Sequence, residues 1–84
     1  MSTILSGKCA LITGSVQGLG LAAARRFAAA GCHVVLHGLT DAQAAATLGR
    51  DIEATHAVRT IFSDADLRRP ADIERMMSSA VSTW

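Results

Sequence analysis

The stretch LITGSVQGLG, residues 11–20, holds three glycines, Gly14, Gly18 and Gly20, between an apolar run and an alanine-rich segment. Where a parallel strand turns sharply into a helix, glycine adopts a positive φ without strain and lets backbone N–H groups approach a phosphate closely. A third glycine at such a junction lets the helix pack tightly against the strand. The stretch therefore predicts a strand-to-helix loop that binds the pyrophosphate of a dinucleotide, and a turn with a purely steric purpose is the alternative.

Strand and helix patterns alternate along the rest of the chain. Short apolar runs predict buried parallel strands over residues 8–13, 32–38 and 57–62. Helical spacing predicts helices over 19–30, from an N-cap at Thr40 or Asp41 to about residue 54, and from Pro70 to about residue 83. The apolar face expected for the first of these helices consists of Leu19, Ala23, Phe27 and Ala30, before a stop at Gly31. The face expected for the last helix consists of Ile73, Met76, Met77 and Val81.

Strands that alternate with helices of this length predict βαβ units with right-handed crossovers. The expected fold class is α/β, a Rossmann-type doubly wound parallel sheet of which residues 1–84 form the first half, β-α-β-α-β-α. With the strands in sequence order, the first two helices cover one face and the last helix covers the other. The first strand is then an apolar edge, and so short a chain buries only about 60–65% of its unfolded surface. We therefore expect the isolated chain to be marginally stable or to associate.

Composition excludes several classes of function. The 84 residues are 50% hydrophobic and 18% charged, as in an ordinary globular domain, and the net charge of +1 offers no basic surface for nucleic acid. The N-terminal sequence MSTILSGK lacks a basic region followed by a long apolar core, and no later apolar run is long enough to span a membrane. We expect a cytoplasmic protein without a nucleic-acid or membrane partner.

The cysteines and histidines suggest no metal site. Cys9 and Cys32 each begin an apolar run without metal-ligand spacing, so we expect both to be buried, reduced thiols. His37 ends the second predicted strand. We expect its ring to be partly solvated with a backbone partner, and a contact with the ribose of a nucleotide is the alternative.

The segment TGSVQGLG, residues 13–20, resembles the TGxxxGxG cofactor loop of the short-chain dehydrogenase/reductase family. Asp66-Leu67, after the third predicted strand, resembles the acidic-aliphatic pair with which this family contacts adenine. The resemblance covers all 84 residues, and VVLHGL and DADL are most similar to the NAD-dependent D-3-hydroxybutyrate dehydrogenases within the family. It implies an oxidoreductase that interconverts a 3-hydroxy acid, such as D-3-hydroxybutyrate, and its ketone, or acts on another alcohol and ketone.

The resemblance implies the following cofactor-binding residues: Gly14, Ser15, Gln17, Gly18, Leu19, Gly20, Leu39, Asp66 and Leu67. Backbone groups of the loop residues Ser15, Gln17, Gly18 and Leu19 would hold the pyrophosphate and the nearby ribose. Leu39 would lie beside the adenosine. Asp66 would accept from the adenine amino group, supported by the Leu67 backbone, and an N-cap or a solvated loop acid is the alternative for Asp66.

The cofactor assignment depends on the segment after the second strand. The dinucleotide fingerprint has an acid about 20 residues beyond the glycines to bind the ribose hydroxyls, but residues 37–39 are His-Gly-Leu. No arginine directly follows this strand to pair with the 2′-phosphate of NADP. Resemblance to the hydroxybutyrate enzymes makes NAD the expected cofactor, ahead of NADP.

No catalytic residue is carried over from the family. Its tyrosine, lysine and serine lie well beyond the cofactor loop, and this sequence has no tyrosine. We expect residues 1–84 to be the N-terminal dinucleotide-binding half of a longer protein that meets its small-molecule substrate, and forms a homo-oligomer, only when complete. The alternative is a non-catalytic nucleotide-binding or dimerisation module. A methyl transferase is disfavoured because the sequence has no acid after the second strand.

Overall fold

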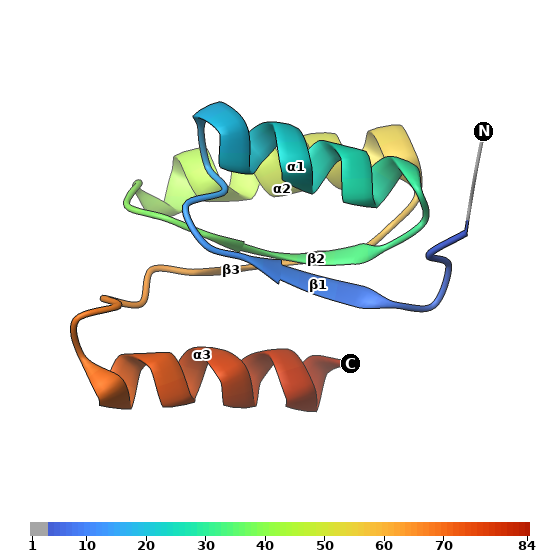
Figure 1. Cartoon of the computed structure of the whole chain (residues 1–84). Coiled ribbons are helices and arrows are strands. Elements are labelled where there is room, and N and C mark those ends of the chain that lie inside the picture. The colour runs from blue at the N-terminus through green and yellow to red at the C-terminus, as the bar shows by residue number, and fades with distance from the viewer. Residues whose placement is uncertain (1–3) are drawn as a thin grey trace.

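The computed structural model describes residues 4–84 and shows six elements in the expected order (Figure 1). The strands are β1 (Cys9–Ile12), β2 (His33–His37) and β3 (Thr60–Ser63). The helices are α1 (Gly18–Ala29), α2 (Ala42–His56) and α3 (Pro70–Thr83). The α/β fold class is confirmed.

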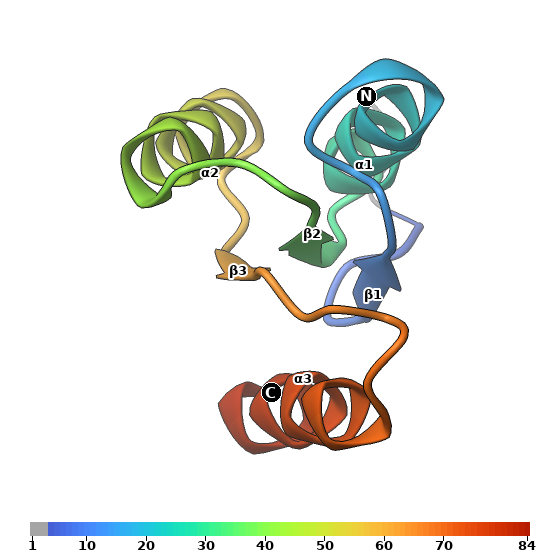
Figure 2. The ribbon, with the colours of Figure 1, turned by 90° about the vertical axis from the view of Figure 1, so that its left-hand side faces the viewer.

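The three strands form one parallel sheet in the order β1-β2-β3, with Cys9 opposite His33 and Val34 opposite Thr60. Helices α1 and α2 lie on one face of this sheet, and α3 lies on the other (Figure 2). Figure 2 looks at the carboxyl ends of the strands, where the loop after β1 leads to α1 and the loop after β3 leads to α3. This arrangement confirms the expected first half of a doubly wound sheet.

Alanines of α1 and larger apolar side chains of α2 and the sheet form the core between the helices and the strands. In the core, Ala24 and Ala28 of α1 and Ile52 of α2 pack against Val34 and Leu36 of β2. Small residues allow α1 to approach the strands closely, and Leu21 is the large apolar side chain of α1 that packs, partly buried, against this core. The expected α1 face is therefore wrong for Leu19 and Phe27, which are 88% and 40% exposed.

The buried face of α3 is only partly as expected. Met76 and Ala80 are buried and Ile73 is half-buried, whereas Met77 and Val81 are exposed. The narrow sheet covers these two residues only in part, and Met77 is 49% and Val81 75% exposed. Met77 and Val81 line a cavity of about 440 Å³ together with Cys9, Leu11, Val35, Ala80 and Trp84.

Backbone conformation explains where the elements end. Gly31, with φ +93°, follows α1 as the expected stop, and Pro70 occupies the first turn of α3. Ala57 adopts φ 55° as the C-cap of α2, which therefore extends to His56, beyond the expected end near residue 54. The prediction that the third strand begins at residue 57 is wrong because this left-handed residue belongs to the helix cap. The strand itself begins at Thr60.

The two cysteines differ in exposure. Cys32 is buried as expected, and burial raises the pKa of its thiol. Cys9 is exposed, contrary to expectation, because β1 has β2 as its single strand neighbour within residues 4–84. In the same part of the chain, none of the helices is both long and apolar enough to cross a membrane.

Candidate functional site

The glycine loop between β1 and α1 has the backbone geometry that its sequence predicts. Gly14 and Gly18 both have φ +61°, and a Cβ atom built on either would find open space within 4 Å. A Cβ on Gly20 would instead collide with the carbonyl oxygen of Gly14 and lie 3.0 Å from the Cα of Ser15. Two glycines therefore provide the turn, and the third lets the first turn of α1 pack on the loop.

The N-terminus of α1 is not capped by its own side chains. Gln17 is the N-cap residue in an extended conformation, without a side-chain cap bond or an acidic residue in the first turn. The N–H groups of Gly18, Leu19 and Gly20 have no hydrogen-bond acceptor within residues 4–84. By contrast, the Asp41 carboxylate caps α2 by accepting from the Ala44 N–H at 2.7 Å. The first turn of α1 thus presents free N–H groups and a positive helix dipole to an anion.

Ser15 fastens the glycine loop to the end of β2. Its N–H donates to the His37 carbonyl at 2.6 Å, and its buried hydroxyl accepts from the His37 N–H at 2.8 Å. Both groups are therefore engaged within the protein. In this geometry Ser15 anchors the loop, and the outward-facing N–H groups belong to the first turn of α1.

A cavity of about 470 Å³ opens beside the loop, at the carboxyl ends of β2 and β3. Its walls are His37, Leu39, Ala65, Asp66, Leu67 and Arg68. Leu39 is 87% exposed although it is a large apolar residue, and Leu67 is 45% exposed. Two exposed leucines around one cavity suit the face of an aromatic ring, since clustered exposed apolar surface marks binding sites.

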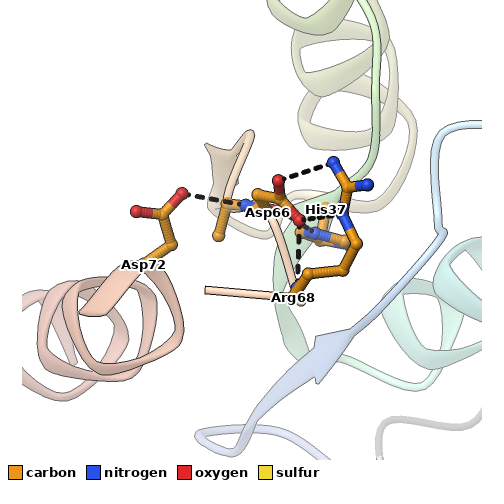
Figure 3. Close-up of polar contacts among 5 residues, drawn as sticks. His37, Asp66, Arg68 and Asp72 are labelled. Atoms are coloured by element: carbon orange, nitrogen blue, oxygen red, sulfur yellow. Dashed lines mark hydrogen bonds and ion pairs between the residues drawn. The ribbon is translucent and has the colours of Figure 1, made fainter. Parts of the chain in front are cut away.

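Two neighbours hold Asp66, one through its carboxylate and the other through its backbone N–H (Figure 3). Arg68 donates from Nε to Oδ1 and from Nη2 to Oδ2, each at 3.0 Å, and its N–H also donates to Oδ1 at 2.9 Å. On the other side, the Asp66 N–H donates to Asp72 Oδ2 at 3.0 Å. The hydrogen bonds from the Arg68 side chain and backbone lower the pKa of the Asp66 carboxyl, so it is ionised at neutral pH.

The structure brings the predicted residues to one edge of the sheet. The loop residues 14–20 surround the α1 N-terminus, while Leu39, Asp66 and Leu67 lie around the adjoining cavity. His37 links the two groups, because it lines the cavity and its Nδ1 accepts from the Gly14 N–H at 3.0 Å. No group of three or more His, Cys, Asp or Glu within the described chain is arranged to hold a metal ion.

The contacts of three residues at this edge were not fully predicted. The backbone partner expected for His37 is confirmed, at both ring nitrogens, but the residue is buried and not partly solvated as expected. Arg68 holds Asp66, and its position two residues after an acid was the available signal. Asp72 in the first turn of α3 fixes the backbone of Asp66 from six residues away, which no local motif indicates.

The comparisons with known proteins agree with this geometry. Residues 8–84 match the family model described as short chain dehydrogenase. D-beta-hydroxybutyrate dehydrogenase of Cupriavidus necator is 39% identical over 81 residues, which are 96% of this chain and 31% of that protein. L-xylulose reductase of Aspergillus niger is 36% identical over 85 residues, covering 99% of this chain and 28% of that enzyme.

A solved structure shows the same fold. L-sorbose reductase of Gluconobacter frateurii, in complex with NADPH and L-sorbose, superposes with a TM-score of 0.88 at 32% identity over 100% of this chain and 32% of that one. The chain thus spans about a third or less of the length of these relatives. By its match over residues 8–84, by these identities and by this fold, the chain belongs to the short-chain dehydrogenase family.

Proposed function

We propose that the chain binds NAD as the cofactor-holding portion of a short-chain oxidoreductase. The observation that carries the proposal is the uncapped N-terminus of α1, reached through a loop whose Gly14 and Gly18 have positive φ and open space around them. Such an end binds a pyrophosphate through free N–H groups and the helix dipole. The adjoining cavity of about 470 Å³ supplies a place for the adenosine.

Each predicted residue has a role in this proposal. The N–H groups of Gly18, Leu19 and Gly20 face the pyrophosphate, with Gln17 at the edge of the same turn. Leu39 and Leu67 contact the adenine ring, and Asp66 accepts from its amino group. Ser15 and Gly14 hold the loop in shape. NAD supplies the hydride acceptor, and the residues of this chain bind and orient it.

The preference for NAD over NADP is supported by the segment after β2. Residues 37–39, His-Gly-Leu, offer no cation at this position to a 2′-phosphate. A relative named as a D-beta-hydroxybutyrate dehydrogenase supports a 3-hydroxy acid and its ketone as the substrate pair of the complete, oligomeric protein. Other relatives are named for sugars, so a different alcohol and ketone is the second candidate.

Calorimetric titration with NAD and with NADP, on chain shown to be folded by circular dichroism, tests the proposal. We expect saturable binding of NAD and weaker binding of NADP. Gly18→Val should abolish binding, because it places a branched side chain at a positive φ in front of the pyrophosphate site. Gly7→Val is the matched control, since Gly7 also has positive φ and open space but lies before β1. Equal NAD affinity in Gly18→Val, or no binding by the folded wild type, would contradict the proposal.

A further inference from the structure

His37, the last residue of β2, connects the two halves of the candidate site. The residue is only 6% exposed. Ring atom Nδ1 lies 3.0 Å from the Gly14 N–H nitrogen, and ring atom Nε2 lies 2.8 Å from the Ala65 carbonyl oxygen. The imidazole therefore spans the gap between the glycine loop and the loop after β3.

The hydrogen bonds define which ring nitrogen carries the proton. The Gly14 N–H can only donate, so Nδ1 accepts and has no hydrogen. The Ala65 carbonyl can only accept, so Nε2 carries the hydrogen and donates. His37 is thus a neutral imidazole in one tautomer, whose orientation is fixed by two backbone groups that belong to different loops.

The backbone of His37 is equally constrained. Its carbonyl accepts from the Ser15 N–H at 2.6 Å, and its N–H donates to the Ser15 hydroxyl at 2.8 Å. Three segments, the glycine loop, β2 and the loop after β3, therefore meet at one buried residue. Because all its polar groups are paired, replacing the ring would remove a partner from the Gly14 N–H and from the buried Ala65 carbonyl.

We propose that His37 is a positioning residue for the cofactor: its ring sets the distance between the pyrophosphate end and the adenine end of the site. Gly14 begins the loop that leads to the free N–H groups of α1, and Ala65 directly precedes Asp66 and Leu67. A dinucleotide must reach both ends at once, so its affinity depends on their spacing. This inference rests on the proposed function, which it deepens.

The test uses three substitutions that separate the two ring contacts. His37→Leu removes both contacts. His37→Asn places Oδ1 where Nδ1 was and restores the acceptor for Gly14. His37→Gln places an amide Nε2 where the ring Nε2 was and restores the donor for Ala65. Each variant is titrated with NAD and with AMP at one neutral pH after its fold has been checked by circular dichroism.

We expect His37→Leu to lose about tenfold or more in NAD affinity, with Asn and Gln each recovering part of the loss. The loss should be larger for NAD than for AMP, because AMP does not span both ends. Equal NAD affinity in folded wild type and His37→Leu, or no recovery in either His37→Asn or His37→Gln, would overturn the inference.

A failure of the proposed function gives a different result. If the folded wild type binds no NAD, that proposal fails, and amide hydrogen exchange of the cofactor-free chain then tests the connection through His37. Faster exchange at Gly14 in His37→Leu than in wild type would support the fixed spacing between the two loops. Equal exchange in the two proteins would overturn it.

Discussion

Gly20 illustrates at the scale of one residue how the loop and the helix depend on each other. A Cβ at this position would collide with the Gly14 carbonyl oxygen and would lie 2.8 Å from the Gly14 carbonyl carbon. These are backbone atoms, so a side chain cannot be accommodated by a change of rotamer. The whole turn from Gly14 would have to move.

We therefore expect Gly20→Ala to lower the free energy of unfolding by about 1–3 kcal/mol, as overpacking does, and to weaken NAD binding as well. Urea denaturation and calorimetric titration measure the two effects. Gly7→Ala is the control: Gly7 has φ +83° and open surroundings, so alanine costs only about 1 kcal/mol of backbone strain and leaves cofactor affinity unchanged. An unaltered NAD affinity in Gly20→Ala would show that the loop tolerates a side chain there.

Asp72 gives a prediction for stability against pH. The hydrogen bond from the Asp66 N–H, together with the charges of Arg75 and Arg69, lowers the pKa of the Asp72 carboxyl from its ordinary value of 3.8. A lowered pKa in the folded state means that the charged carboxylate stabilises the fold. This contribution is complete above the ordinary pKa and disappears as the pH falls below it toward the lowered pKa.

Asp72→Asn should accordingly lower the melting temperature at neutral pH, and the difference from wild type should shrink below about pH 4 as the wild-type carboxyl takes up its proton. Thermal melts followed by circular dichroism at several pH values measure this. Asp51→Asn is the matched control, because Asp51 forms an ion pair with Arg25 in which the side chains are 56% and 39% exposed, and such solvent-exposed pairs contribute little. A pH-independent difference for Asp72→Asn would contradict the assigned cause.

Among the elements, the order of strands and helices was predictable, but the buried faces were not. Gly31 and Pro70 mark helix boundaries through their own backbone geometry, which local sequence reveals. The buried stripe of α1 runs through Ala24 and Ala28, whereas a pattern weighted by large apolar residues selects Leu19 and Phe27. The distance between α1 and the sheet determines which face of the helix is buried, and this distance depends on tertiary packing and not on local sequence.

The candidate site was likewise predictable only in its local motifs. The glycine loop and Asp66-Leu67 are local motifs and were predicted from the sequence. The ring of His37 contacts Gly14, which is 23 positions earlier in the sequence, and Ala65, which is 28 positions later. They exist only because the carboxyl ends of parallel strands meet at one edge. A single sequence cannot indicate which nitrogen of such a ring faces which loop.

The N-terminus of α1 has no side-chain cap, so a substitution that adds one should stabilise the fold and weaken cofactor binding. Gln17 has the extended N-cap conformation, φ −158° and ψ 168°, so an aspartate there can cap the helix. Gln17→Asp should raise the free energy of unfolding by about 0.5–1 kcal/mol and weaken NAD binding, since its charge competes with the pyrophosphate for the same N–H groups. Denaturation and titration measure both effects.

Gln17→Asn separates charge from capping. It can cap without a charge, so it should stabilise the helix and weaken NAD binding less than Gln17→Asp does. If Gln17→Asp stabilised the chain and bound NAD as tightly as wild type, the pyrophosphate would not lie at this helix end.

On the scale of the whole molecule, the apolar surface below β1 predicts self-association. The cavity lined by Leu11, Met77, Val81 and Trp84 lies beside a strand that pairs with β2 alone among the described residues. Unpaired edges and exposed apolar patches favour association. We expect sedimentation velocity to show association that rises with concentration, and Val81→Lys to reduce it.

Ser78→Lys adds the same charge to the same helix at an exposed position that does not line this cavity, and it should reduce association less. A wild-type chain that stays a single monomeric species and unfolds cooperatively at all concentrations would contradict this prediction.

The central claim is that one edge of the sheet binds both the pyrophosphate and the adenosine of a dinucleotide. Amide NMR spectra recorded during a titration with NAD test it most directly. We predict shifts at Gly18, Leu19 and Gly20 around the α1 N-terminus and, in the same titration, at Leu39 and Leu67 around the cavity. Shifts confined to other parts of the chain, or no shifts in a folded protein at saturating NAD, would contradict it.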